Sequence, residues 1–268
     1  MPVSKVATEV KQLTSTDTLS KSERDGLITI ENNVVSLSFD QKTGWLTQFN
    51  YQGNSLVSPL VSEPLKVNLW RAPTDNDLGN NLQNRAKLWQ QAAASFTLSS
   101  LSTMTVDQKN LESIRVQASY KSSLFKGTYQ VSYDISPLGT VDVTSALNLE
   151  QGQELPDIPR VGMQLVMPGE FQFVRWFGRG PQENYADRKT AAAIGLYKMP
   201  VKEQIHHYSR PQENANKTDV RWIALENQQG HGLLAIGEQP LNASAWPYLQ
   251  QDIDFVSGDG SASASGLV

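Results

Sequence analysis

Short runs in which hydrophobic and polar residues alternate dominate the chain from Leu27 onward. Val35, Leu37 and Phe39 fall on one face of an extended segment, and a turn containing Gly44 separates it from the next run. Similar runs recur along the chain, with Gly, Pro, Asn and Asp between them. The predicted strands are 27–30, 34–39, 45–51, 114–120, 129–135, 141–149, 161–166, 171–177, 222–227 and 233–236. Many short strands without a strand–helix–strand rhythm predict an all-β sandwich.

Three segments depart from this pattern. Residues 80–94 contain helix-forming residues and neither Gly nor Pro, which predicts one short helix. Residues 1–26 are rich in Ser, Thr and Lys without apolar periodicity, so we interpret them as a linker or tail and place a single domain over 27–268. Residues 258–266 are small and cannot pack a core, so they are expected to be a frayed tail or a loop that leads to further strands.

Composition narrows the class of protein. The 268 residues include 39% hydrophobic and 19% charged residues, as in ordinary folded proteins, and the net charge of -4 with scattered Lys and Arg argues against a nucleic-acid partner. The chain has no cysteine, which excludes disulfides, thiolate nucleophiles and cysteine metal sites. It also lacks an apolar run of membrane-spanning length and, at the N-terminus, the apolar core of a signal peptide. With Met1 as the start, we expect no membrane association and a location in the cytoplasm.

The first polar motif is residues 70–79, WRAPTDNDLG. A proline-set turn followed by three Asp or Asn residues can offer hydrogen bonds to sugar hydroxyls, with Arg71 holding the carboxylates. The alternative is a turn that caps a following helix, and residue types alone favour that alternative. A calcium loop fits less well, because Gly79 comes one position early and no Glu closes the loop.

The second motif is residues 176–188, where glycines and Pro181 set a sharp turn among matched charges. Glu183 and Asp187 could form the carboxylate pair of a glycosidase. Because Arg179 and Arg188 flank them, we favour structural ion pairs instead. The segment is not a phosphate-binding loop, since no helix with a Lys follows it.

The third motif is residues 210–222, which repeats the tetrapeptide PQEN of residues 181–184 and is interpreted as a structured loop. The three histidines do not form a recognisable metal site: neighbours in a strand face opposite ways, which separates His206 from His207. Zinc-protease, serine-hydrolase and dinucleotide-binding motifs are absent from the sequence. We expect all six tryptophans to lie in the core.

Taken together, the three motifs resemble the C-terminal domain, or small chain, of the large β-galactosidases in glycoside hydrolase family 2. The segments that carry the resemblance, in the same order and at similar spacing, are 70–79 (WRAPTDNDLG), 178–188 (GRGPQENYADR), 210–214 (RPQEN) and 219–222 (DVRW). The resemblance runs from about Leu27 to Trp246. It implies a galactose mutarotase-like β-supersandwich, with two large antiparallel sheets and, from the residue pattern, one short helix.

The resemblance also implies a function. The parent enzymes cleave terminal β-galactosides such as lactose with retention, using two glutamates in a separate barrel domain that also holds Mg and Na. We therefore expect an accessory role for this chain, with no catalytic residue, cofactor or metal of its own. Its expected partner is a catalytic barrel domain or large subunit, and its contact with the galactoside is indirect. The full enzyme is expected to be an oligomer. The family places a mobile loop beside the galactose site, here 79–85. The residues expected near substrate are Asp75, Asn76, Asp77, Gly79, Asn80 and Arg85.

Two departures and two alternatives complete the sequence-based interpretation. In the family the domain continues with strands that carry a Gly-rich loop and a sugar-pocket Trp, so we expect this chain to be incomplete at its C-terminus, either as a fragment or as the partner of a separately encoded subunit. Residues 1–26 resemble the end of a preceding domain and its linker. The alternatives are a mutarotase-like epimerase acting through a His and a Glu, and a carbohydrate-binding module.

Overall fold

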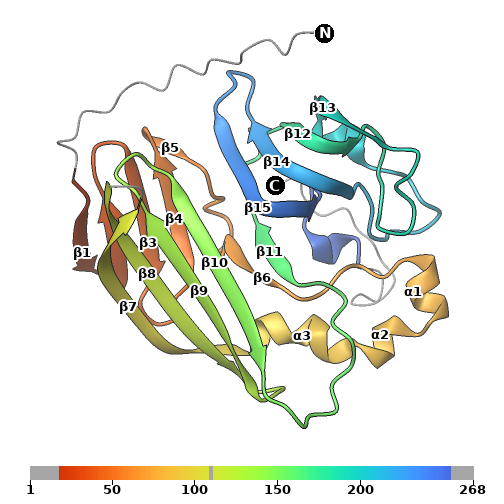
Figure 1. Cartoon of the computed structure of the whole chain (residues 1–268), viewed down its shortest axis with the longest axis horizontal. Coiled ribbons are helices and arrows are strands. Elements are labelled where there is room, and N and C mark those ends of the chain that lie inside the picture. The colour runs from red at the N-terminus through yellow and green to blue at the C-terminus, as the bar shows by residue number, and fades with distance from the viewer. Residues whose placement is uncertain (1–17, 109–110, 255–268) are drawn as a thin grey trace.

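The computed structural model describes residues 18–108 and 111–254, which form three antiparallel sheets, with short α-helices in the connection between the first and second sheets (Figure 1). The all-β, sandwich-like class predicted from the alternating pattern is confirmed, although the strands divide into three sheets rather than two. In the described residues, none of the helices is long and apolar enough to cross a membrane.

The first sheet contains seven strands, six from the N-terminal half of the chain and one later strand, β11. Its order is β1-β2-β3-β4-β6-β11, and β5 pairs with β4. The turn between β3 and β4 shows why the sequence forms a hairpin here: the Asp40 carboxylate accepts from the backbone N–H groups of Lys42 and Thr43, and Gly44 has a φ of 74°. The strands are β1 (Ser20–Arg24), β2 (Leu27–Glu31), β3 (Val35–Asp40), β4 (Leu46–Tyr51), β5 (Asn54–Ser55), β6 (Leu65–Asn68) and β11 (Gly162–Leu165).

The second sheet covers one face of the first, and aromatic side chains fill the space between them (Figure 1). It has the order β10-β9-β8-β7, from β7 (Phe96–Gln108), β8 (Leu111–Ser122), β9 (Gly127–Ile135) and β10 (Val141–Leu149). Trp45 stacks on Tyr120 with ring centroids 4.3 Å apart, and Phe39 contacts Tyr133 at 5.0 Å. These buried rings form the centre of the main core.

The third sheet has its own small core. Its order is β13-β12-β14-β15, from β12 (Phe173–Gly180), β13 (Ala193–Pro200), β14 (Lys217–Glu226) and β15 (Gly232–Ala243). Val174, Trp176 and Val220 are fully buried on its inner face. The short 3-10 helices η1 (Val201–Gln204) and η2 (Gln250–Asp252) lie near its ends.

The helical segment differs from the prediction. Three short helices, α1 (Asp75–Gly79), α2 (Leu82–Arg85) and α3 (Lys87–Ser95), replace the single helix expected over 80–94. Ala86 ends α2 and begins α3 with a φ of -113°, and Trp89 of α3 is fully buried. The amphipathic composition therefore identified the helical region but not its breaks.

The N-terminal sheet also begins earlier than the sequence indicates. Residues 20–24, interpreted as part of a linker, form β1 and pair with β2 along their whole length. Strand β1 is polar and exposed, which explains why hydrophobic alternation could not reveal it. The rest of the expected tail, 1–17, and the small-residue segment 258–266 lie outside the described residues.

Candidate functional site

The three polar motifs meet at one end of a cleft. We call the set formed by residues 70–77, 183–188 and 210–219 the polar junction. Its first and third segments are joined by direct bonds: Asp75 pairs with Arg210 at 2.9 Å, and the Asp75 backbone N–H donates to Gln212 Oε1 at 3.0 Å. The Glu213 N–H donates to the carbonyl of Ala72 at 3.3 Å. Segments about 140 residues apart in the chain are thereby brought together.

The second and third segments are joined through buried amides. Asn184 Oδ1 accepts from both the N–H and the hydroxyl of Thr218, at 2.9 and 2.6 Å. In return, the Asn216 side chain donates to the Asn184 carbonyl at 2.8 Å. All three side chains are buried, so each bond satisfies a polar group that water cannot reach.

Glu213 is the most deeply buried carboxylate of the polar junction. It is 0% exposed, and its Oε1 forms a salt bridge with Arg160. Its Oε2 has no hydrogen-bond partner among the described residues. Burial raises the pKa of Glu213, and the neighbouring Arg160 and Arg71 guanidiniums oppose that rise. The ion pair thus joins a buried carboxylate, one oxygen of which has no partner among the described residues, to a partly exposed guanidinium.

Lys217 is a second buried charge in the same segment. Its side chain is 1% exposed, and its ammonium donates to the Ala215 carbonyl at 2.9 Å and lies 5.2 Å from the centroid of the Trp176 ring. Burial lowers the pKa of Lys217 to about 8, while the Glu183 carboxylate opposes the shift. The cation is held by a carbonyl and an aromatic face rather than by a direct carboxylate contact.

The first motif is a cap as well as a loop. Thr74 accepts from the Asp77 N–H at 3.2 Å, Asp77 accepts from the Thr74 N–H at 3.0 Å, and this capping box begins α1. The other oxygen of Asp77 binds Arg71 at 2.7 Å. The helix-capping interpretation of this motif is therefore confirmed, and Arg71 holds a carboxylate as the sequence indicated.

The residues expected near substrate do not form one cluster in the structure. Asn76 and Asp77 line the cleft, while Asp75 is occupied by Arg210. Gly79 ends α1, Asn80 caps it, and Arg85 lies 3.7 Å from the exposed Asp157. In segment 79–85, Gly79 belongs to α1 and residues 82–85 form α2, with a two-residue turn at Asn80 and Asn81 between them. The left-handed backbone that a hinge glycine would supply occurs instead at Asn81, with a φ of 55°.

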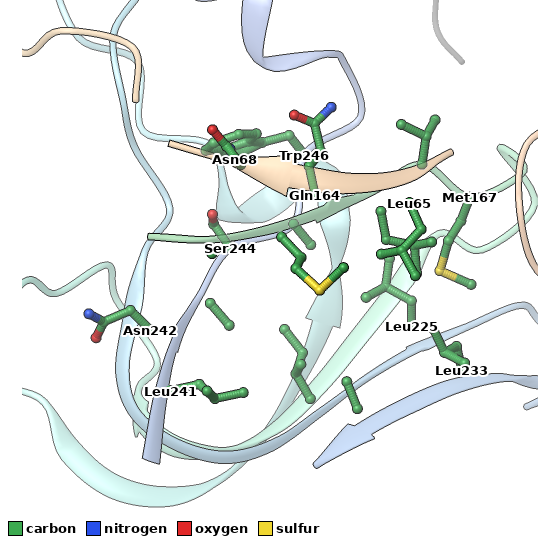
Figure 2. Close-up of a pocket in the computed structure, with 18 of the residues that line it drawn as sticks. Leu65, Asn68, Gln164, Met167, Leu225, Leu233, Leu241, Asn242, Ser244 and Trp246 are labelled. Atoms are coloured by element: carbon green, nitrogen blue, oxygen red, sulfur yellow. The ribbon is translucent and has the colours of Figure 1, made fainter. Parts of the chain in front are cut away.

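The cleft itself is large and mainly apolar. Its volume is about 2140 Å³, and it lies between β6 and β11 on one side and β14 and β15 on the other. Figure 2 shows Leu65, Met167, Leu225 and Leu233 gathered at one end, and Asn68 beside Trp246 at the other. The polar junction adjoins the Trp246 end through Arg71, Asp77 and Tyr185, which also line the cleft.

In the second motif, the structural ion pairs favoured from the sequence are confirmed for Glu183 but not for Asp187, which is exposed and has no ion pair among the described residues. One oxygen of Glu183 binds Arg188 at 3.2 Å and also the Tyr208 hydroxyl, and the other accepts from the Ala215 N–H at 2.8 Å. Arg179 binds Asp219, and hydrogen bonding to Arg179 lowers the pKa of that aspartate. Glu183 and Asp219 are therefore engaged by protein groups, whereas Asp187 lines the cleft with an exposed carboxylate.

Sequence reasoning missed the depth of burial within these motifs. Glu213, Lys217 and their partners were not singled out, because a charged residue in a polar segment is normally exposed. Two tryptophans also differ from the expected core position: Trp222 is only partly buried on the third sheet, and Trp246 lines the cleft. The other four tryptophans are buried as predicted, namely Trp45, Trp70, Trp89 and Trp176.

Comparison with known proteins gives one family. The family model described as "Beta galactosidase small chain" matches residues 31–258. A β-galactosidase of Priestia megaterium is 35% identical over 230 residues, covering 86% of this chain and 21% of the relative. Those of Halalkalibacterium halodurans and Kluyveromyces lactis are 28% and 25% identical, covering 86% and 85% of this chain and 22% of each relative. The chain thus spans about a fifth of the length of these relatives.

Proposed function

Because this chain belongs to the β-galactosidase small-chain family, we propose that it is an accessory domain of an enzyme that hydrolyses terminal β-galactosides such as lactose with retention. The catalytic glutamates, and any Mg or Na, would belong to a barrel domain or large subunit beside it. This chain would shape the edge of the active site through residues 75–85 and support assembly.

The observation that carries the proposal is the engagement of the polar-junction carboxylates. A retaining glycosidase needs two carboxyl groups about 5–5.5 Å apart that face a sugar and are free to act as nucleophile and acid. Here Asp77, Glu183 and Glu213 instead hold a helix cap, a backbone N–H and the partly exposed Arg160. Asp187 is the one carboxylate of the polar junction without such a partner among the described residues, and a single carboxylate cannot supply the pair. Carboxylates that are already bound to protein groups are typical of a structural role, which supports the proposal that this chain forms one part of a larger active site.

The experiment is an activity assay of the purified chain. We expect no hydrolysis of a chromogenic β-galactoside above a mock purification made from a host that lacks β-galactosidase. Hydrolysis that follows the chain through successive columns would contradict the proposal. The same preparation tests the alternatives: an epimerase would speed the interconversion of galactose anomers followed by polarimetry, and a carbohydrate-binding module would bind galactose in calorimetry. The cytoplasmic location stays a prediction.

A further inference from the structure

The outward face of the third sheet carries a row of apolar side chains that crosses all four strands. Leu196, Phe177, Trp222 and Ile236 are successive cross-strand partners in β13, β12, β14 and β15. Directly opposed residues project to the same side of a sheet, so these four form one continuous surface, which we call the apolar row. Leu196, Phe177 and Ile236 are 60%, 38% and 71% exposed.

At the level of the apolar row, the strands carry apolar side chains on both faces. Val174 and Trp176 of β12 point inward and are 0% exposed, while Phe177 of the same strand points outward. Antiparallel strands with one wet face normally alternate hydrophobic inward and polar outward, whereas strands covered on both faces are apolar throughout. Ile194 and Leu234, 46% and 53% exposed, extend the outward surface beside the row. The pattern is typical of a sheet that is covered on its second side.

Cationic side chains lie over and around this surface. Arg175 lies 5.6 Å from the Trp222 ring centroid, and Arg221 lies 5.6 Å from that of Phe177. A register shift in β14 between Val220 and Trp222 lies at the position of Arg221. Lys198 lies 5.5 Å from the ring of Phe173 at the next edge.

The charges around the apolar row do not balance. Glu226 binds both Arg175 and Lys198, and Asp219 binds both Arg179 and Lys189. With Arg221 and the exposed Glu238 of β15, two residues beyond Ile236, these side chains comprise five cations and three carboxylates, a formal charge of +2 on a chain whose net charge is -4. A complementary partner surface would have an apolar centre and carboxylates at its rim.

We propose that the apolar row is the face on which the remaining part of a β-galactosidase polypeptide docks, through an apolar patch rimmed by carboxylates. This inference rests on the proposed function and adds to it which face forms the interface. The relatives devote about four-fifths of their length to other segments, which supply a partner surface. A second copy of this chain fits less well, because two such faces would oppose like charges.

The test uses the full 268-residue chain and, as probe, the Priestia megaterium β-galactosidase with its matching 230-residue segment deleted. Binding is measured by calorimetry, and the oligomeric state by analytical ultracentrifugation. Leu196→Lys and Ile236→Lys place a charge in the apolar row without touching the core. Leu60→Lys is the matched control, because Leu60 is 79% exposed and lies outside the third sheet. Unchanged melting temperatures establish that all variants are folded.

We expect wild type and Leu60→Lys to bind the probe alike, and the two row variants to bind at least tenfold more weakly. Arg221→Glu should also weaken binding and reduce its dependence on salt. Wild-type binding that both row variants retain would overturn this inference and leave the proposed function standing. A folded wild type that does not bind the probe would contradict the proposed function and the inference with it. Self-association lost only in the row variants would assign the face to a second copy instead.

Discussion

Replacing Arg160 tests the energetic role of the buried ion pair. Arg160→Met keeps most of the side-chain length and leaves the Glu213 carboxylate, which is 0% exposed, without its salt-bridge partner. Oε2 already has no hydrogen-bond partner among the described residues. Breaking a buried pair on one side costs about 3–5 kcal/mol, because the remaining charge is uncompensated. At about 2–4 °C per kcal/mol for a domain of this size, the melting temperature should fall by roughly 6–20 °C.

The matched control is Arg85→Met. Arg85 also forms an ion pair, but it lies 3.7 Å from Asp157, whose side chain is 99% exposed. Exposed pairs contribute at most about 1 kcal/mol. Urea unfolding followed by circular dichroism measures both free energies on the same scale. The reasoning is refuted if Arg160→Met costs no more than Arg85→Met.

The pH dependence of the Arg160→Met effect gives a second check. Burial raises the pKa of Glu213 in the folded state above its unfolded-state pKa of about 4.3. The contribution of Glu213 to the free energy of unfolding is therefore complete below the unfolded-state pKa and is lost as the pH rises through the folded-state pKa. Without Arg160 the folded pKa should rise further, and each unit corresponds to about 1.4 kcal/mol. We therefore expect a smaller loss of stability at pH 5 than at pH 8. An equal loss of stability at pH 5 and pH 8 would contradict the conclusion that Arg160 stabilises an ionised Glu213.

Four further predictions concern stability, the first three measured by the same urea unfolding and the fourth by the melting temperature. Trp89→Ala removes a ring that is 0% exposed and whose Nε1–H donates to the Pro156 carbonyl at 2.8 Å, so it should cost about 3–5 kcal/mol; a loss under 1 kcal/mol would contradict its place in the core. Gly79→Ala should stabilise by about 0.5–1 kcal/mol, because Gly79 is helical and an added Cβ meets nothing within 4 Å. Gly44→Ala should instead destabilise by more than about 1 kcal/mol, because φ is 74° and the Cβ would lie 2.6 Å from Leu98 Cδ1; the same sign for both would refute this account of the glycines. A chelator should leave the melting temperature unchanged, and a fall that added Mg²⁺ or Na⁺ reverses would place a metal in this chain.

The sequence predicted ten of the strands and missed β1, β5, β6, β7 and β13. Residues 141–149 were assigned as a strand with the bounds that β10 has. Strand β7, at 96–108, went unnoticed because it is rich in Ser and Thr and carries a register shift between Leu98 and Ser100, which interrupts the period of two. The three-sheet division depends on contacts between distant strands, such as β6 with β11, which no local pattern contains.

The candidate site was predictable in its segments but not in its contacts. The three polar motifs were visible as unusual clusters of Gly, Pro, Asn and charge. Their convergence depends on contacts such as Asp75 with Gln212, which are 137 residues apart, and on burial that reverses the usual preference of charged residues. The apolar row was equally hidden, because it exists only once the registers of four strands are fixed.

The central claim is that this chain completes a β-galactosidase whose catalytic groups lie elsewhere. The most direct test is to add the purified chain to the Priestia megaterium β-galactosidase that lacks its matching segment, and to measure hydrolysis of a chromogenic β-galactoside. The account predicts no activity from the chain alone, little from the shortened enzyme, and a clear gain that saturates as the chain is added. Activity of the chain by itself, or a mixture no more active than the shortened enzyme, would contradict it.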